Sequence, residues 1–190
     1  MKEHVIVSLR ITVVLLVITC GIYPGLVWAV GQVAFRHRAN GSLITQNGRV
    51  IGSELIGQKF TADRYFHSRP SAVDYDATAS GGSNLGPTSK KLANRIAADV
   101  RAVDNGGGSR KTIPADAVTT SASGLDPHIS PANAMAQAAR VARANGFPLE
   151  RVQAMIRART EGRFIGVFGG PRVNVLLLNL DLIARRNAGA

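Results

Sequence analysis

The feature that most constrains this chain is an uncharged stretch near its N-terminus. From Ile11 to Phe35 the sequence reads ITVVLLVITCGIYPGLVWAVGQVAF, without Asp, Glu, Lys or Arg. As an α-helix it would cover roughly 37 Å, more than the hydrocarbon core of a bilayer at about 30 Å. Such a span must be helical, because lipid offers no hydrogen-bond partners to the backbone. We therefore expect a short tail and one transmembrane helix within residues 1–36.

Two features of this stretch bear on how the helix is used. Pro24 removes one intrahelical hydrogen bond and lies between Gly21 and Gly25, a pattern typical of membrane helices that bend and pack against others. Trp28 carries the amphipathic ring that membrane proteins place near a lipid–water interface. We predict that the membrane helix includes Ile11, Pro24, Trp28 and Phe35.

A cleaved signal peptide is the alternative interpretation. Signal peptides carry an apolar core of about 7–15 residues, shorter than this stretch, and no clear small-x-small cleavage site follows it. An uncleaved span is therefore favoured. The flanking charges are nearly balanced, with Lys2 and Arg10 before it and Arg36, Arg38 and Arg49 after it. Because a short tail before a first span most often stays in the cytoplasm, we expect the soluble part outside the cytoplasm.

The net charge of +11 invites a nucleic-acid function, but the distribution of charge argues against it. The basic residues are scattered and aromatic residues make up 5% of the chain, whereas nucleic-acid binding needs clustered cations or stacking aromatics. We predict no nucleic-acid partner, and an affinity either for anionic membrane lipid or for an acidic partner. Cys20, the sole cysteine, lies in the apolar stretch, so disulfides and cysteine-bound zinc are excluded from the rest.

The remainder, residues 37–190, predicts a small mixed α/β domain with helices against a sheet. Asn47-Gly48 is typical of a two-residue hairpin, and Gly146 of a helix end. A flexible Gly-rich joint is expected at 105–111. The predicted elements are strands at Ser42–Gln46 and Arg49–Ile56, helices from Thr88 or Ser89 to Asn105, from Pro131 to Asn145 and from Pro148 onward, a buried strand at Arg163–Gly169, and a strand or strand-to-helix junction at Arg172–Arg186.

The stretch SGGSNLGPTSKK, Ser80 to Lys91, is one residue short of the phosphate-binding P-loop, G-x-x-x-x-G-K-[ST]. Pro87 stands where the lysine should be, and no apolar strand precedes the stretch. The helix that follows could hold an anion at its N-terminus. A Gly/Ser turn before a capped helix is the favoured interpretation. The candidate nucleotide-binding residues are Ser80, Gly81, Gly82, Ser83 and Asn84.

A second group with possible chemistry is Ser123, Asp126 and His128, which offer a hydroxyl, a carboxylate and an imidazole. Three residues so close in sequence rarely reach the geometry of a catalytic triad. A metal shared by the carboxylate and the imidazole would need a third ligand, and naming His67 would be a guess. We predict no catalytic residue and no metal site.

The loop YFHSRPSAVDY, Tyr65 to Tyr75, is the best candidate for docking on another protein. Tyr, Phe and Arg on an irregular loop are the usual anchors of an interface. The alternative is that its aromatic side chains fill the domain's own core. Together with the loop around Asp126, the predicted partner-contact residues are Tyr65, Phe66, Arg69, Pro70, Tyr75, Asp126 and His128.

Several longer stretches, in fixed order, resemble the C subunit family of the Kdp high-affinity potassium-transporting ATPase. The resemblance runs from the N-terminal span to Leu182. One departure is Gly170, where an acidic residue is expected before PRVNV, so no role is carried over to that position. The matching stretches are GSELIGQKF (Gly52–Phe60), YFHSRPSAVDY (Tyr65–Tyr75), SGGSNLGPTS (Ser80–Ser89), SASGLDPHISPANAMAQAARVA (Ser121–Ala142) and RVNVLLLNL (Arg172–Leu180).

This resemblance implies a non-catalytic accessory subunit of an ATP-driven potassium pump in the bacterial inner membrane. The implied partners are a potassium-channel-like subunit and a P-type ATPase subunit, for whose assembly it is needed. Two roles are open. In one it is a catalytic chaperone that raises the pump's ATP affinity, and in the other it caps the potassium entrance.

The resemblance implies no firmly bound cofactor, and ATP with Mg would enter through the ATPase subunit. A membrane-tethered domain that contacts ATP directly through Ser80–Asn84 is the alternative. Because ATP is cytoplasmic, a domain outside the cytoplasm could not reach it, and the expected topology therefore disfavours direct contact.

Overall fold

The computed structural model describes residues 2–105 and 113–188. The chain divides into two compact units, Met1–Ser53 and Glu54–Ala190. Helices and short strands occur together, which confirms the predicted mixed α/β class. Apart from Asn105, the Gly-rich joint expected at 105–111 lies outside the described residues.

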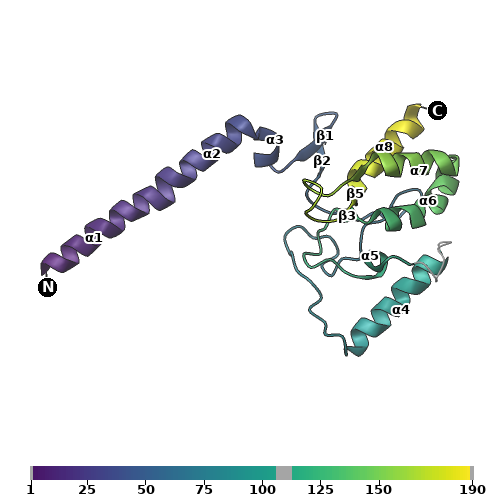
Figure 1. Ribbon diagram of the computed structural model, residues 1–190, viewed down its shortest axis with the longest axis horizontal. Helices are drawn as coiled ribbons and strands as arrows, with labels where there is room; N and C mark the ends of the chain where they lie inside the picture. Colours follow the sequence, from purple (N-terminus) through teal and green to yellow (C-terminus); the bar gives the residue numbers. More distant parts are fainter. Residues whose placement is uncertain (1, 106–112, 189–190) are drawn as a thin grey trace. The chain divides into compact units, whose positions relative to one another are not determined.

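The first unit begins with a long helix built from α1 (Lys2–Leu16), a π-helical segment η1 (Val17–Ile22) and α2 (Tyr23–Ala34) (Figure 1). Among the described residues, this is the one helix long and apolar enough to cross a membrane by length and composition. The π-helical segment lies directly before Pro24, where the Tyr23 N–H bonds to the Ile18 carbonyl five residues back. Proline cannot donate and clashes with the turn before it, and a wide turn accommodates both effects.

The predicted hairpin follows in the same unit, after the short helix α3 (Arg36–Ala39). Strands β1 (Leu43–Gln46) and β2 (Arg49–Ser53) pair antiparallel. Asn47 and Gly48 both take positive φ, at 51° and 74°, as a tight hairpin turn requires. The second strand ends at Ser53 rather than at the predicted Ile56.

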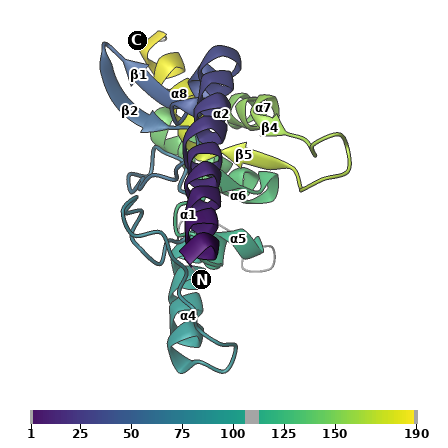
Figure 2. The ribbon, with the colours of Figure 1, turned by 90° about the vertical axis from the view of Figure 1, so that its left-hand side faces the viewer.

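The second unit is built around a small antiparallel sheet of order β3-β5-β4, with strands β3 (His128–Ile129), β4 (Thr160–Glu161) and β5 (Arg172–Asn174). Helices α6 (Pro131–Asn145) and α8 (Val175–Ala188) both contact β5, and α7 (Leu149–Ala158) packs on these two helices (Figures 1 and 2). The remaining helices are α4 (Lys90–Asn105) and α5 (Ala115–Val118). The core consists of Phe66, Ile129, Ala134, Ala138, Val141, Ala142, Val152, Met155, Ile156, Val173, Val175, Leu178 and Leu182.

The ends of α6 follow the predicted capping pattern. The Ser130 hydroxyl accepts a hydrogen bond from the Asn133 N–H, and Pro131 occupies the first turn. At the other end Gly146 adopts the left-handed conformation with φ of 68°. The predicted limits of this helix are therefore confirmed.

The junction predicted in Arg172–Arg186 is also confirmed. Strand β5 passes directly into α8, and the Asn174 side-chain carbonyl accepts a hydrogen bond from the Leu177 N–H, which caps the new helix. The short strand and the helix together place Val173, Val175 and Leu178 in the core.

The buried strand predicted at Arg163–Gly169 is wrong. Residues 161–170 are all exposed, and the segment is a loop between β4 and β5 with only the isolated pairing of Phe164 with Phe168. Gly166 and Gly169 take positive φ, which interrupts an extended strand. The apolar composition had indicated burial, but no neighbouring strand or helix in the described part of the chain covers these side chains.

Candidate functional site

Two irregular segments of the second unit, residues 64–75 and 119–128, lie against each other, and we call them the loop platform. The Ser71 hydroxyl donates to the Gly124 carbonyl at 2.7 Å, and the Ser121 N–H donates to the Pro70 carbonyl at 3.4 Å. The Ser71 oxygen also accepts from the N–H of Tyr75 at 3.0 Å. These bonds replace regular secondary structure, since buried backbone groups must be paired in some other way.

Helices α6 and α8 hold the start of this platform through two amide side chains. The Asn179 amide accepts from the Phe66 N–H at 2.8 Å and donates to the Phe66 carbonyl at 3.0 Å. The Gln137 amide does the same for the next residue, His67, at 2.8 and 3.1 Å. Each amide thus satisfies one donor and one acceptor of an irregular backbone, as a neighbouring strand would.

Arg69 joins the two segments of the platform. Its guanidinium bonds to the Asp126 carboxylate at 3.2 Å, and to the Thr119 hydroxyl and Thr120 carbonyl, both at 3.4 Å. The Tyr75 hydroxyl donates to the Arg69 carbonyl at 2.5 Å. Burial, and next the negative charge of Asp74, raise the pKa of the Tyr75 phenol, so it remains a donor at neutral pH.

Asp126 stays ionised at the centre of this cluster. Burial by itself would raise the pKa of the carboxyl, but hydrogen bonds from the His128 side chain and N–H, together with the charge of Arg69, outweigh burial and lower it. The His128 N–H donates to the carboxylate at 2.9 Å, and the His128 Nδ1 lies 3.6 Å from it. The Asp126 carboxylate therefore has a structural role, in which its hydrogen bonds hold the loop in place.

The structure brings together five of the seven predicted partner-contact residues in this platform: Arg69, Pro70, Tyr75, Asp126 and His128. Phe66 is 0% exposed and belongs to the core, so the alternative of a core-filling aromatic describes this residue. Tyr65 is half-buried, packs against the core and lies under the Arg64 guanidinium at 5.0 Å. The Ser123 hydroxyl accepts a hydrogen bond from the Leu125 N–H at 3.1 Å, which gives this side chain a structural role in its loop in place of the catalytic one.

The Gly/Ser stretch packs on the same platform. The Gly81 N–H donates to the Ser123 carbonyl at 2.8 Å, and the Ser80 hydroxyl lies 3.2 Å from that oxygen. A Cβ placed on Gly82 would lie 3.0 Å from the Ala122 carbonyl oxygen. Gly82 therefore allows backbone to approach backbone, and the Gly81 amide already has a partner within the chain. Ser83 and Asn84 continue the stretch without secondary structure before α4.

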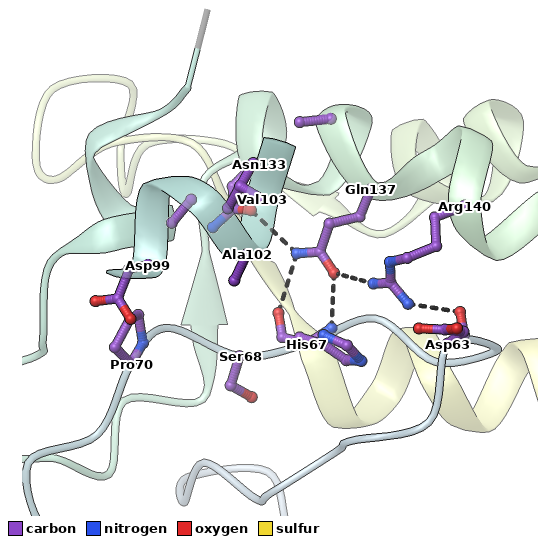
Figure 3. A pocket seen from close by; sticks show the side chains of 12 residues that line it. Asp63, His67, Ser68, Pro70, Asp99, Ala102, Val103, Asn133, Gln137 and Arg140 are labelled. Atoms are coloured by element: carbon purple, nitrogen blue, oxygen red, sulfur yellow. Dashed lines mark hydrogen bonds between the residues drawn. The ribbon is translucent and has the colours of Figure 1, made fainter. Parts of the chain in front are cut away.

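Beside the platform lies a cavity of about 420 Å³ between residues 63–70, α4 and α6 (Figure 3). His67, Gln137 and Arg140 line it, with Asp63 and Asp99 also at its wall. Burial, and next the charge of Arg140, lower the pKa of His67, while its bond to the Ala62 carbonyl and the charge of Asp63 oppose the shift. The imidazole is therefore held in its neutral form.

The sequence analysis missed the residues that support this site, above all Asn179, Gln137 and Arg140. The Arg140 guanidinium donates to the Asp63 and Tyr65 carbonyls at 2.5 and 3.0 Å. One sequence signal could have identified Asn179, because this polar residue interrupts the apolar run VLLLNL at a position that is buried. Over the described ranges, no group of three or more His, Cys, Asp or Glu could hold a metal ion.

Fold and site together define a small α/β domain with a preformed polar loop surface, in a chain whose described residues include one helix of membrane-spanning length. A family model for KdpC, described as the c chain of K+-transporting ATPase, matches residues 5–184. The chain belongs to the KdpC family, which confirms the resemblance inferred from the sequence.

Its relatives cover nearly the whole chain. A protein of Koribacter versatilis (strain Ellin345) is 52% identical over 187 residues, 96% of this chain and 95% of the relative. A protein of Gemmatimonas aurantiaca is 54% identical over 185 residues, 96% of this chain and 93% of the relative. One of Myxococcus xanthus is 55% identical over 182 residues, 94% of this chain and 86% of the relative. Each is named Potassium-transporting ATPase KdpC subunit.

Proposed function

We propose that this chain is the c-chain subunit of a potassium-transporting ATPase, anchored in the bacterial inner membrane by its N-terminal helix. The observation that carries this proposal is the family match over residues 5–184, which includes most of the candidate membrane helix, the loop platform and most of α8. Its partners in the complex are the potassium-channel-like subunit and the P-type ATPase subunit. Its role is to support their assembly and to modulate the pump's affinity, without catalysis of its own.

The loop platform is the surface we assign to the channel-like subunit. Its polar groups are already arranged by internal bonds, such as the one from Arg69 to Asp126, so little conformational entropy would be lost on docking. A rigid loop surface of this kind supports binding better than chemistry. The carboxylate of Asp126 and the hydroxyl of Ser123 are both occupied by hydrogen bonds within the loops.

We place ATP with Mg on the ATPase subunit rather than on this chain. Two observations support this assignment. Pro87 replaces the lysine of a P-loop, and the Gly81 N–H that would face a phosphate donates to Ser123 instead. A soluble domain outside the cytoplasm, as the short tail before the first span favours, would in addition have no access to ATP.

The proposal is tested with a matched pair of substitutions at exposed alanines. Ala72 lies in the loop platform and Ala154 lies on α7. In the assembled complex, Ala72→Arg should reduce co-purification of the other subunits and raise the potassium concentration for half-maximal ATPase activity, because a bulky charge would enter the docking surface. Ala154→Arg should leave both unchanged. Equal behaviour of the two variants would remove the platform as a docking surface.

A further inference from the structure

The loop between β4 and β5 carries large apolar side chains that no described residue of its unit covers. Phe164 is 68% exposed, Ile165 75%, Val167 69% and Phe168 66%. Figure 2 shows this loop extending away from the sheet and helices of its unit. We call residues 162–170 the apolar loop. An exposed group of this kind usually marks a surface that meets a protein or a membrane.

The backbone of the apolar loop is paired within the loop itself. Phe164 and Phe168 exchange both of their N–H···O bonds, at 2.9 and 3.0 Å. The Gly166 N–H donates to the Arg163 carbonyl, and the Val167 N–H to the Phe164 carbonyl. A tip in which four amides are already bonded enters a medium without hydrogen-bond partners at lower cost, because backbone desolvation is the main cost of entry for a loop.

The composition of the tip also favours contact with a medium that offers no hydrogen bonds. The residues FIGVFGG at 164–170 include no polar side chain. Protein interfaces form about one hydrogen bond per 100–200 Å² and surround their apolar centre with polar groups. This tip can contribute only its few remaining backbone groups to such bonds, whereas lipid requires none.

Cationic side chains flank the apolar loop. Arg163 is exposed and forms no ion pair with another described residue. Arg172, at the other end, pairs with Glu161 at 2.8 Å, and its side chain is 45% exposed. Arginines beside apolar tips are suited to a bilayer surface, where anionic headgroups lie just outside the acyl chains. The net charge of +11 adds a general attraction to such a surface.

The candidate membrane helix in the same chain also favours lipid as the partner of the apolar loop. A candidate membrane span ends at Ala34, and the unit that carries the apolar loop begins at Glu54 in the same chain. We propose that the apolar loop inserts Phe164, Ile165, Val167 and Phe168 into the interfacial layer of an anionic bilayer, with Arg163 at the headgroups. The loop is thus a second membrane contact of the subunit. This inference does not depend on which pump subunit the loop platform binds.

Fluorescence quenching in vesicles tests the insertion. The full chain carries Trp28→Phe, which removes its sole tryptophan, together with Phe168→Trp, and is reconstituted in vesicles of phosphatidylcholine and phosphatidylglycerol. Lipids brominated on the upper acyl chain should remove about half of the emission, because interfacial insertion reaches about 5–10 Å into the headgroup and acyl boundary. The matched control is Leu149→Trp, at the exposed start of α7, which should not be quenched.

Two further variants separate insertion from mere proximity. In the Phe168→Trp background, Val167→Glu should abolish the quenching, since a carboxylate does not enter the acyl region, and Arg163→Gln should weaken it only with anionic lipid. No quenching of the Phe168→Trp protein overturns the proposal. Equal quenching of the Leu149→Trp protein does so as well. Shielding from aqueous acrylamide that appears only when the other pump subunits are added would assign the loop to a protein partner and also overturn it.

Discussion

The side-chain amide of Asn179 bonds to both backbone polar groups of Phe66, although the two residues are 113 positions apart in the sequence. Both residues are fully buried, at 1% and 0% exposure. Helix α8 therefore fixes the point where the loop platform leaves the hydrophobic core. Because a buried N–H and a buried carbonyl depend on this amide, the contact has more energetic consequence than a surface hydrogen bond.

Asn179→Leu keeps the branched shape of the side chain and removes both bonds. We expect the free energy of unfolding to fall by about 2–6 kcal/mol, since two buried backbone groups lose their partners at about 1–3 kcal/mol each. Urea denaturation of the full chain in detergent, followed by circular dichroism, measures the change. Asn187→Leu, at an exposed position of the same helix, is the control and should shift the free energy by less than about 0.5 kcal/mol. Equal effects of the two variants would contradict the role assigned to Asn179.

Two glycines of the Ser80–Lys91 stretch, Gly82 and Gly86, offer a second matched pair. A Cβ on Gly82 would lie 3.0 Å from the Ala122 carbonyl oxygen, whereas a Cβ on Gly86 would meet nothing within 4 Å. Gly82→Ala should therefore destabilise the domain by about 1–3 kcal/mol through backbone displacement. Gly86→Ala should be neutral or slightly stabilising, because alanine restricts the unfolded chain. Thermal unfolding of both variants measures the change in stability. A larger loss of stability in Gly86→Ala than in Gly82→Ala would show that packing on the loop platform is not the reason for the glycine at position 82.

The sequence alone predicted those parts of the fold that are set by neighbouring residues. Ser130, Pro131 and Gly146 define α6 through local capping, and Asn47-Gly48 fixes the hairpin turn. The Arg163–Gly169 loop was mispredicted because burial depends on what packs against a segment, and apolar content does not contain that information.

The candidate site was predicted only in part, for the same reason. Of its two segments, the loop Tyr65–Tyr75 was singled out by its aromatic and arginine residues, and Asp126 and His128 were added from the second. The amides of Gln137 and Asn179 that hold them act across 70 and 113 residues, and no local pattern encodes such a distance.

The lowered pKa of His67 predicts how the stability of the domain depends on pH. Its pKa in the folded state is lowered below the ordinary 6.5, first by burial and then by Arg140. The unfolded chain therefore binds a proton at higher pH than the folded one, so stability is full above pH 6.5 and falls as the pH drops from 6.5 through the folded pKa. His67→Gln should flatten this part of the profile, measured as urea midpoints between pH 7.5 and 5. An unchanged slope in the variant would assign the dependence to other groups.

Direct nucleotide binding is tested on the full chain in detergent by equilibrium dialysis with Mg-ATP. We expect no saturable binding at micromolar concentrations, because the Gly81 amide is bonded to Ser123 and Pro87 provides neither a charge nor an N–H. Micromolar binding that is lost in Gly81→Ala and retained in Asn187→Ala would reinstate the Gly/Ser stretch as a nucleotide site. Weak binding that is equal in both variants would indicate nonspecific attraction to a basic protein.

The side of the membrane on which the domain lies follows from a cysteine reaction in intact cells. With Cys20→Ser as background, Ala97→Cys places a thiol on the exposed face of α4, and Glu3→Cys places one in the N-terminal tail. We expect an impermeant maleimide to label Ala97→Cys and to leave Glu3→Cys unlabelled until the cells are opened, because the short tail stays in the cytoplasm. The reverse pattern would put the domain on the side where ATP is present. It would then remove the topological argument against nucleotide contact, while the argument from the bonded Gly81 amide would still apply.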